Sequence, residues 1–260
     1  MSDVLAVAVE GRGLVDPSES VFAADDEALL RGSAAFETLR VYRGRPFMLD
    51  RHLERMRVSI AGLALPPLGD ANALVALALA DAAEQDGVLR LYRTSLALVV
   101  IASRLPPIPA TLTLRTLDIG EPAPLLAGVK STSYALAFAG RRDAQAHGAD
   151  DVLFRNGPTL LECATANLWL RTGDTLRTPE LGPRVLTGIT REVVCTLAPE
   201  AGFGVSETAV TLDDAAEADE AFTSSSIMEL VPVTAIDGRA IPQGEAAEAL
   251  KAALRKAALG

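Results

Sequence analysis

Cysteine, histidine and lysine are scarce in this 260-residue sequence, and long hydrophobic runs are absent. The two cysteines and two histidines do not have the spacing of metal ligands, so we expect no metal site and no disulfide framework. The longest apolar runs, near 71–80 and 96–102, are shorter than the roughly 20 residues that a membrane span needs. The N-terminus lacks the basic start and apolar stretch of a secretory signal. These absences predict a cytoplasmic protein with no membrane partner.

Positive charge is also in deficit, with 24 lysine and arginine residues against 34 aspartate and glutamate residues and a net charge of −10. This negative field repels a phosphate backbone, so we expect no nucleic-acid partner. Hydrophobic residues make up 49% of the chain, which is enough to bury a sizeable core. The composition therefore predicts a folded globular protein rather than a disordered one.

The order of strand and helix signals predicts an α+β protein with two domains. A segment rich in proline and glycine, 118–128, is the expected linker between them. We therefore expect an N-terminal α+β domain over 1–117 and a second domain over 129–260.

Several elements can be placed within these domains from capping residues and periodicity. Asp50 and Asp70 each precede a helical pattern, and the second of these helices is expected to end near Gly87. A single strand is expected over 88–102, and a C-terminal helix over 246–259.

Lysine usage singles out one residue. Only three lysines are present, and two of them lie in the predicted C-terminal helix, so Lys130 is the only lysine in the first 250 residues. Arginine stays protonated in proteins, whereas a lysine can become a neutral amine and act as a nucleophile or base. Composition alone would also fit an ordinary surface lysine, so this residue gains meaning only from its neighbours.

Three further features could bind an anion or a cofactor ring. Gly188, Ile189 and Thr190 start a predicted helix, where free N–H groups and the helix dipole favour a phosphate. The hydroxyl-rich run 223–226 follows a strand, and Glu162 lies in an apolar strand where a buried carboxylate needs a partner. Each feature alone also fits an ordinary helix cap, polar turn or surface glutamate. Together with a lone lysine they suggest pyridoxal phosphate (PLP) chemistry.

Five segments carry a direct resemblance to the class IV aminotransferases, which include branched-chain and D-amino-acid aminotransferases, (R)-amine transaminases and aminodeoxychorismate lyase. They occur in family order and at family spacing between about residue 20 and residue 245: FETLRVYRGRPFMLDRHLERM, VKSTSYALAFAGRRDAQAHGADDVLF, LLECATANLWL, LTGITREVV and ADEAFTSSSIMELVPVTAIDG. The resemblance implies a two-domain fold-type IV PLP enzyme. Its N-terminal domain would be small, and its larger C-terminal domain would be a mixed β-barrel with helices.

The resemblance also implies roles for individual residues. Lys130 is expected to form the Schiff base with the cofactor, and Glu162 to pair with the pyridine nitrogen. The other expected cofactor contacts are Arg55 on the phosphate, Tyr134 on the ring hydroxyl, Leu186 on the ring, and Gly188, Ile189, Thr190, Ser225 and Ser226 around the phosphate. Phe36, Arg40 and Arg90 match positions that face the substrate.

Some residues depart from the family pattern. The sequence before Phe36 lacks the usual Gly-Asp-Gly-like turn, and Cys163 replaces the glycine that usually follows the glutamate. The arginine–x–histidine pair of typical D-amino-acid enzymes has no evident counterpart after Arg90. The resemblance therefore leaves the substrate class open.

The resemblance implies ping-pong transfer of an amino group from a small amino donor to a 2-oxo acid acceptor, carried out by a homodimer. Elimination of pyruvate, the aminodeoxychorismate lyase reaction, uses the same cofactor and lysine and remains an alternative. A cofactor-free binding protein is a third possibility, in which Lys130 would be a surface residue.

Overall fold

The computed structural model describes residues 3–80, 85–121 and 124–260, and the chain forms two compact units. Unit 1 consists of Met1–Pro107 together with Val129–Tyr134, and unit 2 consists of Ile108–Gly128 together with Ala135–Gly260. Each unit has its own sheet and its own hydrophobic core.

The units divide the chain differently from the expected boundary at 117. The strand Leu112–Asp118 pairs on both sides with strands of unit 2, so the first unit ends before it. Val129–Tyr134 belongs to unit 1 because it is bonded to a strand there: the N–H of Phe36 donates to the carbonyl of Lys130 at 3.1 Å. The expected linker, 118–128, contains residues 122–123, which lie outside the described part of the chain.

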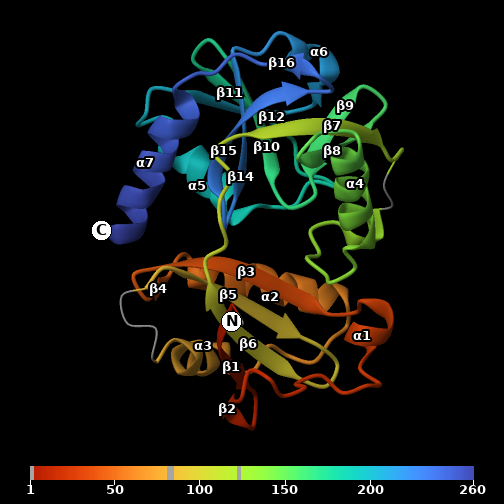
Figure 1. Ribbon diagram of the computed structural model, residues 1–260, viewed down its shortest axis with the longest axis vertical. Coiled ribbons are helices and arrows are strands. Elements are labelled where there is room, and N and C mark those ends of the chain that lie inside the picture. The colour runs from red at the N-terminus through yellow and green to blue at the C-terminus, as the bar shows by residue number, and fades with distance from the viewer. Residues whose placement is uncertain (1–2, 81–84, 122–123) are drawn as a thin grey trace. The chain divides into compact units, whose positions relative to one another are not determined.

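Unit 1 is an antiparallel sheet, and two of its three described helices pack against one face (Figure 1). The strand order is β2-β1-β6-β5-β3-β4. The strands are β1 (Val4–Val9), β2 (Gly13–Val15), β3 (Ala35–Tyr42), β4 (Arg45–Pro46), β5 (Gly87–Arg93) and β6 (Leu98–Arg104), and the helices are α1 (Glu27–Arg31), α2 (Leu49–Gly62) and α3 (Ala71–Leu79).

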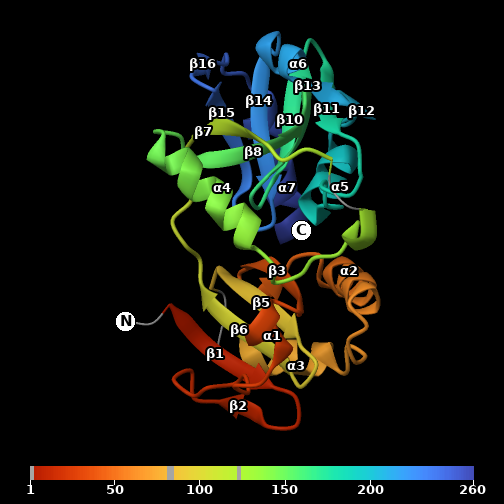
Figure 2. The same cartoon turned by 90° about the vertical axis from the view of Figure 1, so that its right-hand side faces the viewer.

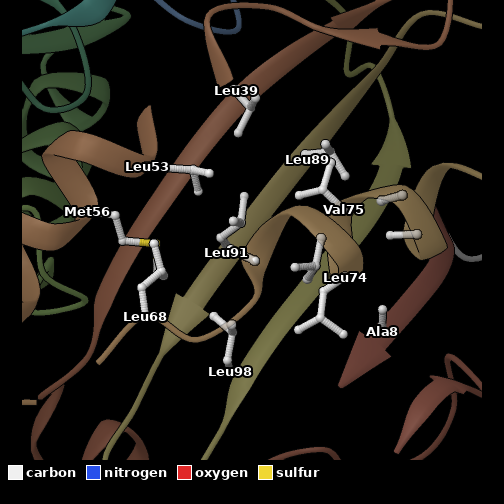
Figure 3. Close-up of a cluster of buried hydrophobic side chains, with 14 of the residues drawn as sticks. Ala8, Leu39, Leu53, Met56, Leu68, Leu74, Val75, Leu89, Leu91 and Leu98 are labelled. Carbon is white, nitrogen blue, oxygen red and sulfur yellow. The ribbon is translucent and has the colours of Figure 1, made fainter. Parts of the chain in front are cut away.

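The core of unit 1 lies between this sheet and the helices α2 and α3 (Figure 3). Alternate residues of β3 and β5, among them Leu39 and Leu89, point into it, because side chains on a strand alternate between faces. Leu53 and Met56 of α2 meet them at helical spacing. The second helix does not reach Gly87 as expected: α3 ends at Leu79, residues 81–84 lie outside the described part of the chain, and Gly87 begins β5.

The single strand expected over 88–102 is wrong, because the chain turns back within it to form β5 and β6. Thr94 stabilises this turn: its hydroxyl accepts hydrogen bonds from the N–H groups of Leu96 and Ala97 and donates one to the carboxylate of Asp26. A turn closed by one threonine side chain has no glycine or proline to mark it in the sequence.

Unit 2 contains a closed barrel. Six strands form a ring in the order β10-β14-β15-β7-β8-β9, which closes where Asn167 pairs with Glu162. β7 runs parallel to both of its neighbours, so the barrel is mixed. Its strands are β7 (Leu112–Asp118), β8 (Asp151–Asn156), β9 (Thr159–Cys163), β10 (Asn167–Thr172), β14 (Glu220–Ser225) and β15 (Glu229–Ile236).

The remaining elements of unit 2 extend or cover the barrel. Helix α4 packs along β8 and β7 (Figure 2), and α7 packs against β14, β15 and α5. The added elements are β11 (Thr175–Pro179), β12 (Gly204–Thr208), β13 (Val210–Thr211), β16 (Arg239–Ala240), the 3₁₀ turn η1 (Pro124–Leu126), and the helices α4 (Ala135–Ala146), α5 (Ile189–Leu197), α6 (Leu212–Ala216) and α7 (Ala246–Leu259). The C-terminal helix has the predicted bounds, and no described helix is long and apolar enough to cross a bilayer.

Candidate active site

Lys130 is held in unit 1 by its backbone and has aromatic neighbours at its amine. Its N–H donates to Ser59 Oγ at 2.9 Å, and its carbonyl accepts from Phe36 on β3. The ammonium Nζ lies 4.4 Å from the centroid of the Phe36 ring and donates to Tyr134 Oη at 3.0 Å. Phe36 and Tyr134 meet edge to face, with ring centroids 5.2 Å apart. Cation–π contacts and the phenol therefore fix the position of the amine.

Helix α2 carries His52, Arg55, Ser59 and Gly62 at helical spacing, and the last two lie against Lys130 and Val129. Ser59 Oγ accepts from the Lys130 N–H and donates to the Arg55 carbonyl at 3.2 Å. A Cβ on Gly62 would lie 2.6 Å from a methyl carbon of Val129, so this glycine lets the lysine segment approach the helix closely.

The turn before β3, where the expected family motif is missing, is bonded to the same lysine segment. Gly32 ends α1 with a left-handed φ of 69°. Its carbonyl accepts hydrogen bonds from the hydroxyls of Thr132 and Ser133, at 2.8 and 3.0 Å. The hydroxyl groups of Thr132 and Ser133, two and three residues after Lys130, therefore hold this turn in place.

Arg55 is bound by a buried carboxylate that sequence analysis did not single out. Glu37 of β3 accepts from Arg55 Nε and Nη2, both at 2.7 Å, and its Oε2 lies 2.7 Å from His52 Nδ1. Burial by itself raises the pKa of Glu37, but hydrogen bonds and charge from Arg55 and His52 outweigh it and lower the pKa to about 2. Burial lowers the pKa of His52, so the ring stays neutral at pH 7. Glu37 is therefore a fixed anion that orients the Arg55 guanidinium.

The face of the sheet that carries Phe36 also carries two arginines. Phe36 is paired with Tyr92 across β3 and β5, and Arg90 lies two residues from Tyr92 on the same face. The Phe36 and Tyr92 rings stack with centroids 6.0 Å apart, and Arg90 Nη1 lies 3.4 Å from Ser103 Oγ. Arg40 is buried, with its guanidinium carbon 4.8 Å from the Tyr42 ring centroid.

In unit 2, Glu162 and Leu186 are joined through Asn167, a residue that sequence analysis missed. Glu162 Oε2 accepts from Asn167 Nδ2 at 3.1 Å and from the Leu186 N–H at 2.9 Å. Asn167 Nδ2 also donates to the Leu186 carbonyl at 3.1 Å. The Asn167 side chain is buried, so its amide fixes both the carboxylate and the Leu186 backbone.

Gly188 belongs to the same cluster. A Cβ at this position would lie 2.0 Å from Asn167 Oδ1, so only glycine fits there. Gly188 is the N-cap of α5 and provides no side-chain cap, which leaves the first N–H groups of Ile189 and Thr190 without one. The predicted helix start is confirmed, and its backbone donors and dipole suit an anion.

The serine run lies beside this cluster on the next strand. Ser224 is paired with Asn167 across β14 and β10, while Ser225 ends β14 and Ser226 begins the turn to β15. Ser225 Oγ accepts from the Met228 N–H at 3.2 Å. Glu162 is one residue from the end of β9, and Asn167 begins β10, so these groups gather at one end of the barrel.

Cys163, the residue after the candidate ring carboxylate, points into the barrel core. Burial raises its pKa well above the usual value for a thiol, with a further contribution from Asp151 and Glu162. A neutral buried thiol is a poor nucleophile, so Cys163 is a packing residue.

The thirteen candidates are thus divided between the units. Unit 1 holds Phe36, Arg40, Arg55, Arg90, Lys130 and Tyr134, and unit 2 holds Glu162, Leu186, Gly188, Ile189, Thr190, Ser225 and Ser226. Their chemistry fits PLP: an amine for its aldehyde, a fixed carboxylate for its ring nitrogen, and an uncapped helix start for its phosphate. Within the described residues no group of three or more His, Cys, Asp or Glu side chains could hold a metal ion.

Comparison with known proteins identifies a family. Residues 34–236 match the family described as Amino-transferase class IV. A Methanocaldococcus jannaschii relative, named for branched-chain-amino-acid aminotransferase, is 30% identical over 264 residues, covering 91% of this chain and 90% of its own. A bifunctional aminodeoxychorismate lyase / D-amino acid transaminase of Mycobacterium tuberculosis is 28% identical over 276 residues, covering 94% of this chain and 95% of its own.

The fold is also found in solved structures. The PLP-bound form of a hypothetical aminotransferase from Mycobacterium tuberculosis matches with a TM-score of 0.86 and 28% identity, over 98% of both chains. The fold and these similarities define the class, a two-domain α+β enzyme of fold type IV that uses pyridoxal phosphate. The chain belongs to the class IV amino-transferase family.

Proposed function

We propose that this enzyme is a transaminase that moves an amino group between an amino acid or amine and a 2-oxo acid. The observation that carries the proposal is the position of Lys130, whose amine contacts the Phe36 ring and donates to Tyr134 Oη. When bound, PLP supplies an aldehyde that condenses with amines and a protonated ring that accepts electrons. The residues of this chain must then bind the cofactor, orient it and move protons.

Lys130 is the group that we assign to proton transfer. With PLP and substrate bound, the neutral amine of Lys130 would take the proton from the substrate Cα. The negative charge of Glu162 would keep the nitrogen of a bound ring protonated, and Asn167 and the Leu186 N–H hold the carboxylate in one orientation. Tyr134, which accepts from the lysine, is assigned to the ring hydroxyl.

The phosphate is assigned to the helix start at Gly188, Ile189 and Thr190, to Ser225 and Ser226, and to Arg55. The backbone N–H groups of α5 and the hydroxyl groups supply hydrogen bonds, and Arg55 supplies a positive charge. Leu186 is assigned to one face of the ring, where its backbone is fixed by Glu162 and Asn167.

The substrate is proposed to be a carboxylate, bound on the sheet face that carries Phe36. Arg90 and Arg40 lie on this face of an otherwise acidic protein, and the Phe36 and Tyr92 rings provide its apolar part. Arg90 is half-buried and so can reach a ligand, whereas Arg40 is buried against Tyr42.

Absorption spectroscopy followed by peptide mapping tests the assignment of Lys130. Protein saturated with PLP is expected to show a yellow band that borohydride bleaches, leaving a pyridoxyl group on Lys130. Lys130→Ala is expected to lose the band and all turnover, whereas Lys256→Ala, at an exposed lysine of α7, should keep both. A full-strength band in Lys130→Ala would contradict the proposal.

A second variant tests the ring carboxylate. Glu162→Gln is expected to bind PLP but to lower turnover by at least a hundredfold, because a neutral amide cannot keep the ring nitrogen protonated. Single-turnover kinetics would locate the loss in removal of the substrate Cα proton, and an unchanged rate there would contradict the role of Glu162.

Pyruvate release is the competing reaction. One relative is named both as a lyase and as a transaminase, so the two activities have to be measured side by side. The two activities are separated by assaying purified enzyme for amino transfer to a 2-oxo acid and for pyruvate release from aminodeoxychorismate. Pyruvate release without amino transfer would replace the transaminase assignment with a lyase.

We also propose a homodimer, which sedimentation equilibrium at several protein concentrations would test.

A further inference from the structure

The turn between β14 and β15 has a glutamate where such turns usually have glycine. Ser225 pairs with Glu229, which leaves a three-residue loop over 226–228. Glu229 adopts a left-handed φ of 58°. Hairpins of this length commonly end with a left-handed residue, and glycine adopts that conformation without steric cost. For glutamate the conformation costs about 1 kcal/mol or more, so another interaction must hold it.

An ion pair with the C-terminal helix supplies that interaction. Glu229 is 1% exposed, and Arg255 of α7 binds its carboxylate through Nε at 3.0 Å and Nη2 at 2.7 Å. The Arg255 side chain is half exposed, whereas that of Glu229 is buried. The arginine therefore acts by neutralising the buried glutamate and not by filling the core. A buried carboxylate without such a partner would be strongly destabilised.

The same helix is fixed to the hairpin at its other end. Glu220, the first residue of β14, accepts hydrogen bonds from the N–H groups of Ala246 and Ala247 at 3.0 and 2.8 Å. Helix α7 also packs against α5, whose first residues form the helix start described above (Figure 1). One helix therefore braces both elements that carry the proposed phosphate ligands of unit 2.

We propose that Glu229 and Arg255 are positioning residues that hold the turn at Ser225 and Ser226 in the shape that binds the cofactor phosphate. This inference rests on the proposed function, because it assumes that these serines meet the phosphate. The ion pair keeps Glu229 in its left-handed conformation. That conformation fixes how the loop 226–228 joins β15, and so fixes the shape of the turn that begins at Ser226. Neither residue touches the cofactor in this scheme.

Comparing two ligands separates this role from a general effect on folding. Pyridoxal 5'-phosphate and pyridoxal share the ring and the aldehyde, but only the first carries a phosphate. Arg255→Ala is expected to weaken binding of the phosphorylated form at least tenfold, while pyridoxal affinity changes less than threefold. Both affinities are read from the visible band during titration of the full-length protein.

A matched control and a rescue variant complete the experiment. Arg177→Ala removes an arginine from Asp214, a half-buried carboxylate of unit 2 outside this hairpin, and should leave the ratio of the two affinities unchanged. Glu229→Gly combined with Arg255→Ala should restore phosphate-form binding, because glycine takes a positive φ unaided and no buried carboxylate remains. If Arg255→Ala does not fold, Arg255→Lys replaces it, with a smaller loss expected because lysine cannot bind the carboxylate bidentately.

The outcomes are distinct. A lower melting temperature for Arg255→Ala with an unchanged affinity ratio would show that the pair serves stability alone and would overturn the proposal. Weak binding that persists in the double variant would also overturn it. Absence of any band in the wild-type protein would instead remove the proposed function, and the positioning role with it.

Discussion

Gly188, the residue before α5, has no room for a side chain, because a Cβ there would lie 2.0 Å from Asn167 Oδ1. The Asn167 amide cannot move aside without releasing Glu162 and the Leu186 carbonyl. We therefore expect Gly188→Ala to lower the free energy of unfolding by about 2 kcal/mol and to weaken PLP binding. Urea unfolding and PLP titration would measure the two effects.

Gly182 provides the control for that substitution. It lies in the same loop, its φ is not positive, and no atom lies within 4 Å of the Cβ that alanine would add. Gly182→Ala should therefore behave as the wild type does. Equal behaviour of the two alanine variants would mean that Asn167 does not confine the helix start.

Glu37 makes the stability of unit 1 depend on pH. Its pKa is about 2 in the folded protein and near 4.5 when unpaired, so the stabilisation is complete above pH 4.5 and is lost as the pH falls toward 2. His52 acts in the same direction, because its lowered pKa means that acid protonates the unfolded chain first. A shift of this size in Glu37 corresponds to about 3 kcal/mol.

Glu37→Gln should remove this pH dependence. The variant is expected to unfold more easily at pH 7 and to approach the wild type as the pH nears 2. Glu10→Gln is the control within unit 1, since Glu10 also pairs with an arginine, Arg93, but its side chain is half exposed. Parallel curves for the wild type and Glu37→Gln between pH 5 and 2 would contradict the assignment.

At the scale of elements, α2 matters because it holds the lysine segment as well as the core of unit 1. Ser59→Ala leaves the Lys130 N–H without its acceptor, which should cost about 2 kcal/mol of stability. It should also slow the reaction of Lys130 with PLP, because the backbone of the lysine is less well fixed. Stopped-flow absorbance would measure that rate, and Val58→Ala, at an exposed position of the same helix, is the control.

Elements with strong local signals could be predicted from the sequence. The bounds of the C-terminal helix and the start of α5 at Gly188 follow from periodicity and a helix-breaking glycine, and the structure has them as expected. The β5–β6 turn could not be predicted, because Thr94 closes it through Asp26, a residue 68 positions away in the sequence. The strand expected there has the right residues but contains a reversal that only the tertiary contact explains.

In the candidate site, the residues with distinctive chemistry could be named from the sequence. The residues that hold them in place by hydrogen bonds could not. A lone lysine and a glycine at a helix start stand out in the sequence. Asn167, Glu37 and Ser59 do not, because each acts through a hydrogen bond to a residue on another element. Only the burial of Asn167 and Glu37 in apolar strands could have suggested that they have partners.

At the scale of the whole chain, the two units carry different chromophores. The single tryptophan, Trp169, is buried in unit 2, and the three tyrosines, Tyr42, Tyr92 and Tyr134, all belong to unit 1. Tryptophan fluorescence therefore follows unit 2, while the near-ultraviolet circular dichroism of tyrosine follows unit 1. We expect Glu37→Gln to lower the urea midpoint of the tyrosine signal and to leave the tryptophan midpoint unchanged. A joint shift would mean that the units unfold together.

The barrel of unit 2 closes at a single residue pair, Asn167 with Glu162, and these two residues are also the proposed supports of the cofactor ring. The two residues are five positions apart in the sequence, so this closing contact is local and costs little loop entropy to form. The proposed support of the ring nitrogen is therefore part of the short turn that joins β9 to β10. A change in this turn would alter the surroundings of the ring nitrogen without opening the other strand pairs of the barrel.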